Sequence, residues 1–392
     1  MTNQRIPTSR RQFLDQSALA AAGLFVAAAP GACSQAGPRA HILDTRVISL
    51  DAQHYHGWPT VTRLKSGRLL VVCSGGREEH VCPFGRVDLC ASDDDGRSWG
   101  WPRTLLDSDI DDRDAGILET ASGALLVTTF TSLACEPILT KAEASGAWET
   151  AKLRRWRAAH NRLTAAERHA ELGQWMIRST DGGRTWSPRY SSIVNSPHGP
   201  VQLRDGRLLY AGKELWTGQR RNGVCESRDD GQTWRWLADI PTRPGDDAAQ
   251  YHELHAVECG KGGLIVHIRN HNDANSRETL QSESADGGRT WSVPRAIGVW
   301  GLPSHLLRLR DGRLLMSYGY RRPPFGNQAR LGTDEGRTWS EPMIISADGA
   351  STDLGYPSTV ELGDGTLLSI WYEALKDNPL AVLRQARWRI AP

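Results

Sequence analysis

The sequence carries almost no net charge. It has 47 Lys and Arg against 45 Asp and Glu, a formal net charge of +2 at pH 7. Its first 38 residues hold three Arg and one Asp, so the remainder has 44 residues of each sign. No excess of one sign is available to attract nucleic acid or an acidic membrane surface. We therefore expect neither as a partner.

The seven cysteines lack the close spacing that metal sites use. No Cys-x-x-Cys pair occurs among them, and zinc ligands often come as such pairs. We predict no metal ion and no cofactor. Six of the seven cysteines could form disulfide bonds if the protein matures in an oxidising compartment. These six are Cys73, Cys82, Cys90, Cys135, Cys225 and Cys259.

A long apolar run is also missing, and the nearest to one lies at the amino end. ALAAAGLFVAAA is too short and too rich in Ala for a membrane span. It follows TSRRQFL, with Arg10 and Arg11 adjacent, and precedes PGACSQAG. This order predicts that residues 1–38 are a twin-arginine export signal and that the protein is periplasmic or secreted. A lipid anchor at Cys33, giving a membrane-anchored lipoprotein, is the alternative, although Pro30 fits it poorly.

What the sequence does contain is a short repeated motif. A pattern of a small residue, any residue, Asp, any residue, Gly, any residue, Ser or Thr, and Trp occurs five times. A catalytic site needs one acid of each kind, whereas a structural unit needs a copy in every repeat, so these Asp are predicted to be scaffold acids. Asp caps turn amides, Gly accepts positive φ, and the Trp anchors the turn. The five are Asp94, Asp181, Asp229, Asp286 and Asp334.

A second repeated signature predicts β-hairpins between the Asp motifs. Six segments join two apolar strands through a short turn with Gly, starting near residues 62, 119, 201, 257, 308 and 360. In the first five repeats the Asp motif joins two further strands, which makes four-stranded propeller blades. The sixth repeat lacks one strand, and residues 41–50 lack a partner. We predict an all-β, six-bladed β-propeller over residues 39–392, in which the amino-terminal strand closes the last blade.

One interval between predicted strands is unusually long. Residues 133–175 separate the second hairpin from the second Asp motif and include AAERHAELGQW, whose composition favours helix. We predict a partly helical insertion here, and not a separate domain.

The first strands of all blades start at one opening of the central channel. The segments at these starts contain His, Asp, Glu and Tyr, and Arg residues follow several second strands. Side chains of these types, meeting at one opening, are suited to binding a polar ligand. The segments are HYHGW (54–58), DDRDAG (111–116), NSPHG (195–199), YHELH (251–255), GLPSH (301–305) and DLGYPS (353–358).

Five Asp motifs on six predicted blades resemble the sialidase or neuraminidase superfamily of BNR-repeat proteins, over nearly all of residues 41–392. The resemblance implies a Tyr nucleophile at the start of the last blade, which GYPSTVELGDG places at Tyr356. It also implies a Glu that takes the Tyr proton, which YHELHAVE places at Glu253. An Arg that binds the substrate carboxylate is placed by GLIVHIRN at Arg269.

The chain departs from the family pattern in its first blade. Family enzymes open that blade with Tyr/Phe-Arg-Ile-Pro, whose Arg binds the carboxylate, but HGWP has Gly57 in the Arg position. The family acid/base Asp follows a Gly-Arg, and SGGREEHVCPF offers only Glu79 and His80 there. The third carboxylate-binding Arg matches loosely with Arg321 or Arg322. These departures imply that the substrate is an acidic sugar other than ordinary sialic acid, or that a residue of another type donates the proton.

The candidate site residues follow from both arguments. The catalytic candidates are Tyr356 and Glu253, with His80, Glu79 and Asp114 as alternative proton donors. The substrate-binding candidates are Arg77, Arg113, Arg269, Arg321, Arg322, His198, His252 and His305.

The resemblance implies an exo-glycosidase that releases sialic acid or a related acidic monosaccharide from a glycan. We expect the protein to be exported and monomeric. A polysaccharide lyase or an unusual deoxysugar hydrolase is an alternative, because His and Tyr near Arg also suit proton abstraction beside a uronate carboxylate. A carbohydrate-binding propeller without turnover is a second alternative, since one Arg and one Asp of the family site are missing.

Overall fold

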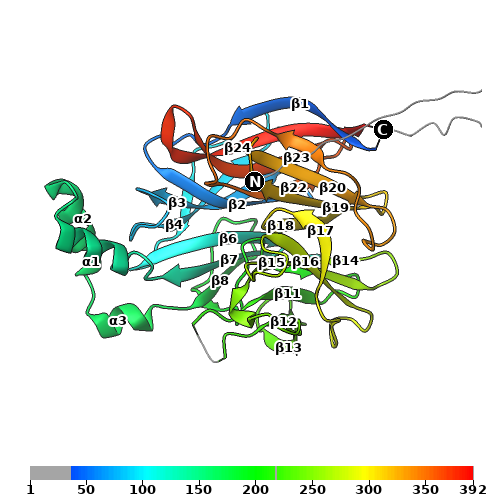
Figure 1. Ribbon diagram of the computed structural model, residues 1–392, viewed down its shortest axis with the longest axis horizontal. Coiled ribbons are helices and arrows are strands. Elements are labelled where there is room, and N and C mark those ends of the chain that lie inside the picture. The colour runs from blue at the N-terminus through cyan, green and yellow to red at the C-terminus, as the bar shows by residue number, and fades with distance from the viewer. Residues whose placement is uncertain (1–36, 217–218, 392) are drawn as a thin grey trace, which may run out of the picture. The chain divides into compact units, whose positions relative to one another are not determined.

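The computed structural model describes residues 37–216 and 219–391. The predicted export signal, except for its last two residues, and Cys33 lie outside this part of the chain. The described residues form six antiparallel four-stranded sheets, arranged as the blades of a propeller (Figure 1). This confirms the predicted all-β, six-bladed architecture.

Five blades are built from consecutive strands. Blade 1 has β2 (Tyr55–Arg63), β3 (Leu69–Arg77), β4 (Arg86–Ser92) and β5 (Arg103–Leu106). Blade 2 has β6 (Asp111–Glu119), β7 (Leu125–Ser132), β8 (Gln174–Ser179) and β9 (Tyr190–Ser191). Blade 3 has β10 (Val201–Gln202), β11 (Leu208–Lys213), β12 (Asn222–Ser227) and β13 (Arg235–Asp239). Blade 4, preceded by a 3-10 turn (Ala248–Gln250), has β14 (Tyr251–Glu258), β15 (Leu264–Asn270), β16 (Glu278–Ser284) and β17 (Arg295–Trp300). Blade 5 has β18 (Ser304–Arg308), β19 (Leu314–Tyr320), β20 (Gly326–Gly332) and β21 (Met343–Ser346).

The last blade is closed by the amino-terminal strand. Its sheet order is β1 (Arg39–Val47), β24 (Asn378–Ala391), β23 (Leu367–Leu375) and β22 (Leu354–Glu361), and Figure 1 shows β1 beside β24. Ile42 lies opposite Trp388 and packs against the cluster that holds Met343 and Ile345. The predicted ring closure is therefore present, and it covers the edge of the last sheet.

The core lies between neighbouring blades. One apolar cluster joins blades 6 and 1 through residues such as Leu368 and Val71, and another joins blades 1 and 2 through Val72 and Val127. The remaining blade interfaces carry clusters of the same kind. Because each sheet buries both faces against its neighbours, the ring supports the strand ends that surround the channel.

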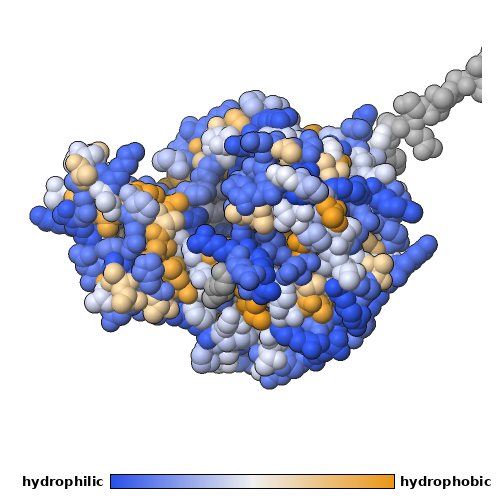
Figure 2. Space-filling model, turned by 60° about the horizontal axis from the view of Figure 1, so that its bottom comes forward, coloured by the Kyte–Doolittle hydropathy of each residue, from blue (hydrophilic) through white to orange (hydrophobic). Residues whose placement is uncertain are grey.

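Three helices occupy the interval between β7 and β8. They are α1 (Glu136–Ser145), α2 (Thr150–His160) and α3 (Ala165–Ala170). The last begins at a capping box of Thr164 and Glu167. They stand beside β3, β4 and β6 (Figure 1), and apolar atoms gather where this lobe borders the propeller (Figure 2). None of the helices in the described ranges is long and apolar enough to cross a membrane.

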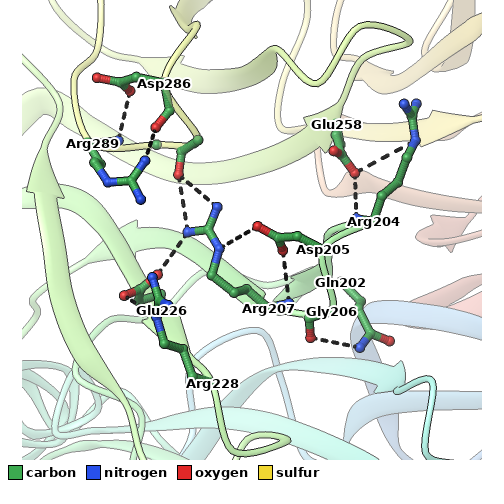
Figure 3. Close-up of polar contacts among 12 residues, drawn as sticks. Gln202, Arg204, Asp205, Gly206, Arg207, Glu226, Arg228, Glu258, Asp286 and Arg289 are labelled. Carbon is green, nitrogen blue, oxygen red and sulfur yellow. Dashed lines mark hydrogen bonds and ion pairs between the residues drawn. The ribbon is translucent and has the colours of Figure 1, made fainter.

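The Asp motifs lie in the loops between the third and fourth strands of blades 1 to 5. Asp286 accepts hydrogen bonds from the amides of Arg289 and Thr290 at 3.0 and 2.9 Å, and Figure 3 shows it beside Arg289. The hydroxyl and amide of Thr290 hold the pKa of Asp286 well below its usual value. Trp291 is buried, and its indole N–H donates to the carbonyl of Gly288 at 3.0 Å. The acid thus stabilises its own turn, as predicted.

One Asp-motif loop is also tied to the neighbouring blade. Arg207, in the turn before β11, donates to the carbonyl of Gly287 at 3.2 Å and to Glu226 at 2.8 Å (Figure 3). Its Nε donates to Asp205 at 2.7 Å. These contacts join blade 4 to blade 3 on the outside of the ring.

The six cysteines in the described part of the chain are buried and free. The disulfide alternative is therefore not realised among them. No group of three or more His, Cys, Asp or Glu within residues 37–216 and 219–391 is arranged to hold a metal ion.

Candidate active site

The starts of the innermost strands surround a pocket of about 320 Å³. Four of the six segments placed at the strand starts supply the first residues of β2, β6, β14 and β22, and a fifth, GLPSH, enters β18. The pocket is lined by Trp58, His80, Arg113, Asp114, Phe130, Ser132, Ala134, Glu253, Arg269, Arg321, Tyr356 and Tyr372.

Three of the lining residues project from the same kind of backbone distortion. Trp58, Asp114 and Tyr356 have φ of 53°, 46° and 52°, a backbone region that residues other than Gly rarely adopt. Each lies where the pairing of its strand with the next one shifts register, in β2, β6 and β22. A bulge redirects a side chain, so an indole, a carboxyl and a phenol from three blades all line this pocket. Strain of this kind is typical of functional sites.

Tyr356, Glu253 and Arg269 form a closed triangle of hydrogen bonds. The Tyr356 hydroxyl donates to Glu253 Oε1 at 2.6 Å and accepts from Arg269 Nη1 at 2.8 Å. Arg269 Nη1 also lies 2.9 Å from Glu253 Oε1. The other carboxylate oxygen of Glu253 is buried without a partner in the described residues.

The charges of this triangle follow from its surroundings. Burial and the neighbouring Glu253 raise the pKa of Tyr356 well above its usual value. Burial acts to raise the pKa of Glu253 too, but Arg269, His252 and the hydrogen bond from Tyr356 together lower that pKa overall. At neutral pH the phenol is therefore protonated and the carboxylate is ionised, which is the resting state that a nucleophile and its base require.

Asp114 and Arg113 reach the pocket from β6. Burial raises the pKa of Asp114 to about 7, against the opposing charge of Arg113. The Arg113 guanidinium lies 4.5 Å from the centre of the Trp58 ring and 3.7 Å from Asp111. Asp114 is thus a carboxyl that exchanges a proton near neutral pH, and Arg113 is a cation supported by an aromatic face.

His80 belongs to a second hydrogen-bonded group at the rim of the pocket. Its Nδ1 lies 2.9 Å from Asp353 Oδ1 and 2.9 Å from the Tyr55 hydroxyl. Asp353 also accepts hydrogen bonds from Tyr55 at 3.0 Å and from Tyr372 at 3.2 Å. The Trp58 ring lies edge-on to His80, with 5.0 Å between ring centres.

Arg321 completes the set of cations in the pocket. Its Nε donates to the carbonyl of Leu354 at 3.0 Å, and its guanidinium lies 5.9 Å from the Tyr356 ring centre. Arg322, the alternative from sequence, lies instead 3.7 Å from the Trp300 ring centre and does not line the pocket. The geometry therefore selects Arg321 of the two.

Two candidates from the first blade are held away from the pocket. Arg77 is fully buried and binds both oxygens of Asp111, at 2.6 and 3.0 Å, so its guanidinium is not available to a substrate. Glu79 points to α2, where it binds Lys152 at 2.9 Å. In this blade His80 alone, of the three polar candidates, lines the pocket.

The remaining histidine candidates also lie outside the pocket lining. His198 and His305 are buried and pack against His255, with ring centres 4.7–5.3 Å apart. His252 packs against His271 at 4.8 Å.

Sequence reasoning did not single out Tyr55, Trp58, Asp353 and Tyr372. Three of these belong to segments placed at the channel opening, HYHGW and DLGYPS. The signal was therefore present, but many residues in those segments are polar or aromatic, and only the bulges decide which side chains turn inward.

Comparison with known proteins places the chain among repeat propellers. It matches the family described as BNR repeat-like domain over residues 158–369. It is 26% identical to a xyloglucanase of Paenibacillus sp over 239 residues, covering 51% of this chain and 22% of that protein. It is 27% identical to a sialidase of Micromonospora viridifaciens over 209 residues, covering 44% of this chain and 31% of that protein. The chain thus spans less than a third of the length of these relatives.

Solved structures show the same fold. A protein of unknown function from Dyadobacter fermentans DSM 18053 superposes with a TM-score of 0.72 at 22% identity, covering 90% of this chain and 99% of that one. The Hadza microbial sialidase Hz136 superposes with a TM-score of 0.61 at 17% identity, covering 86% of this chain and 65% of that one. At these identities the likeness establishes the propeller fold alone.

Proposed function

Because the chain belongs to the BNR-repeat family, within the sialidase superfamily of six-bladed propellers, we propose that it is an exo-glycosidase that releases an acidic sugar from glycans. The contact that carries the proposal is the 2.6 Å hydrogen bond from the Tyr356 hydroxyl to Glu253, inside a pocket that also holds three arginines. Sialic acid and related acidic monosaccharides are the proposed products.

The chemistry of such a sugar explains why a Tyr suits the nucleophile. A sialic acid bears its carboxylate on the anomeric carbon, and a neutral phenol meets less repulsion there than an anionic Asp or Glu. As the phenol oxygen attacks, its proton passes to Glu253, which is already ionised and within hydrogen-bond distance. Arg269 donates hydrogen bonds to both Tyr356 and Glu253, so it stabilises the negative charge on the carboxylate oxygen before the proton transfer and on the phenol oxygen during it.

The acid group of the substrate must bind differently from that in the family pattern. A side chain at Gly57 would begin 3.1 Å from the Tyr55 ring, so an Arg in this position would need the ring to shift. Trp58 lines the pocket beside it, and Arg113 from the next blade lies over the Trp58 ring. We assign the substrate carboxylate to Arg113, Arg269 and Arg321, so that Arg113 supplies the cation that position 57 lacks.

Product analysis tests this function directly. The purified protein is incubated with a panel of acidic oligosaccharides that carry terminal sialic, ketodeoxy or uronic acids, and products are identified by mass spectrometry. Release of a free acidic monosaccharide with gain of one water supports the proposal. An unsaturated product without added water would establish a lyase, and binding without any product would establish a carbohydrate-binding propeller.

Export through the twin-arginine route remains part of the proposal. It rests on the adjacent Arg10 and Arg11 before a short apolar run. Fusion of residues 1–38 to a reporter that is active only after export, with Arg10→Lys and Arg11→Lys together as control, tests it. Export that persists in the double variant would contradict the assignment.

A further inference from the structure

We infer that His80 is the general acid and base of the proposed reaction and that Asp353 positions it. This inference rests on the proposed function, because a departing sugar alcohol needs a proton from the protein. The triangle of Tyr356, Glu253 and Arg269 does not provide that proton. Glu253 receives the proton of Tyr356, and an Arg guanidinium stays protonated.

The position of His80 fits a proton donor to the leaving group. An exo-glycosidase encloses one terminal sugar, and the rest of the glycan extends into solvent. His80 lines the pocket, yet 44% of its side chain is exposed. Its ring and that of Tyr356 both contact Trp58 edge-on, with ring centres 5.0 and 6.4 Å from the indole. The proposed acid and the nucleophile thus both lie against one buried indole.

The hydrogen bonds of His80 leave one ring nitrogen for chemistry. Nδ1 is held by Asp353 and Tyr55, both at 2.9 Å, whereas Nε2 has no hydrogen-bond partner among the described residues. Burial acts to raise the pKa of Asp353, but the hydrogen bond and charge of His80, with Tyr55 and Tyr372, lower it overall. Asp353 therefore holds the His80 ring through Nδ1 and leaves Nε2 free to donate a proton to a substrate.

The helical insertion fixes the loop that carries His80. The residue before His80, Glu79, binds Lys152 of α2 at 2.9 Å, and Glu78 accepts from Arg155 and from the Trp156 indole at 2.7 and 3.1 Å. Trp156 is fully buried in a cluster with Cys82 and Cys135. The buried Arg77 donates to the carbonyl of His80 at 3.1 Å. Arg77 and Glu79 thus hold the loop that carries His80 in place.

Asp114 is the competing donor, and its burial argues against it. Only 7% of Asp114 is exposed, so it faces the enclosed sugar and not the part of the glycan that remains in solvent. It also lies beside Arg113 and near Glu253, whose charges act on its pKa in opposite directions. His80 is therefore better placed to reach the leaving oxygen.

The proton movements balance over two steps. In the first, Tyr356 oxygen bonds to the anomeric carbon as its proton passes to Glu253, the bond to the leaving oxygen breaks, and His80 Nε2 gives its proton to that oxygen. In the second, Nε2 takes a proton from water, whose oxygen bonds to the anomeric carbon. The bond to Tyr356 then breaks, and the phenol regains its proton from Glu253.

Comparison of two leaving groups tests the role of His80. The probes are the acidic oligosaccharide that the wild-type protein cleaves best and the 4-nitrophenyl glycoside of the same sugar. His80→Gln should lose about a hundredfold or more in kcat/KM on the oligosaccharide but at most about tenfold on the nitrophenyl glycoside, because nitrophenolate leaves without a proton. His169→Gln, an exposed histidine on α3, should match the wild type on both.

The outcomes separate this inference from the function on which it rests. Equal losses on both probes, or no loss on the oligosaccharide, would overturn the acid role while the glycosidase function stands. Absence of turnover by the wild-type protein on every probe would overturn the function itself. Retained cleavage of the nitrophenyl glycoside by His80→Gln also shows that the variant is folded.

The same two probes test the positioning role of Asp353. Asp353→Asn replaces the carboxylate that holds His80 Nδ1 with a weaker acceptor, so kcat/KM should fall more on the oligosaccharide than on the nitrophenyl glycoside. Equal losses on both probes in a folded Asp353→Asn variant would show that Asp353 has only a structural role.

Discussion

The Tyr356 hydroxyl donates a 2.6 Å hydrogen bond to Glu253, although the two residues lie on the innermost strands of different blades and are 103 positions apart. Arg269, on the strand paired with that of Glu253, bonds to both. Because all three are anchored in the sheets, the site is held in place before any substrate arrives.

Tyr356→Phe should lose about a hundredfold or more in kcat with KM little changed, because the variant lacks the nucleophilic oxygen. Glu253→Gln should lose a similar amount, since the phenol then has no base. The double variant should be little worse than either single one, because the two act as a unit. Steady-state kinetics on the preferred substrate measures all three, and near-full activity of Tyr356→Phe would rule out the Tyr mechanism.

Arg113→Gln should raise KM for an acidic substrate by about tenfold to a hundredfold, as expected when one charge-assisted hydrogen bond is lost. Arg322→Gln is the matched control, because Arg322 packs on Trp300 outside the pocket and should leave KM unchanged. Equal effects of the two substitutions would contradict the assignment of Arg113 to the substrate carboxylate.

Trp291→Ala should lower the free energy of unfolding by about 3 kcal/mol or more, because it removes a buried aromatic side chain from the interface between blades 3 and 4. Asp286→Ala should also destabilise the fold through the loss of its turn hydrogen bonds. Urea unfolding measures both, with the exposed Asp273→Ala as control. Loss of turnover by Asp286→Ala without any loss of stability would refute the scaffold role.

Removal of residues 1–50 should destabilise the whole propeller, because it deletes β1 and exposes the edge of β24. Removal of residues 1–38 alone keeps all of β1 and serves as the control. Thermal unfolding of the two proteins is compared. Equal midpoints would show that β1 contributes little to ring closure.

The buried histidines should make the fold sensitive to acid. Burial lowers the pKa values of His267 and His305 to about 3, whereas both titrate near 6.5 when exposed. Below pH 6.5 the unfolded chain therefore binds protons that the folded chain does not. The free energy of unfolding should fall from about pH 6.5 toward pH 3, by up to about 1.4 kcal/mol per pH unit for each group.

His305→Gln isolates one of these contributions. The variant should show a shallower loss of stability than the wild type between pH 6.5 and pH 4.5, whatever its stability at pH 7. Urea unfolding across this range measures the slope. Identical slopes for the two proteins would mean that His305 is not buried as a neutral group.

The fold can be predicted from the sequence alone. Five copies of the Asp motif and six Gly-containing hairpins are local patterns, and each encodes a turn through backbone preferences that need no distant partner. The last repeat lacks one strand, and residues 41–50 lack a partner. Together these two observations predicted that β1 closes the last blade. The resemblance to the sialidase superfamily, and not the repeats alone, singled out Tyr356, Glu253 and Arg269, which lie in hydrogen-bond contact.

Which of the other polar side chains face the pocket depends on how the blades pack in the folded protein. Arg77 and His80 lie three residues apart, yet Arg77 is buried against Asp111 while His80 reaches the rim. Asp353, just before the first strand of the last blade, meets His80 and Tyr55 of the first blade only because these two blades are neighbours in the ring. The direction of a side chain at a bulge depends on backbone angles such as those of Trp58 and Asp114, and contacts between blades, far apart in sequence, set those angles.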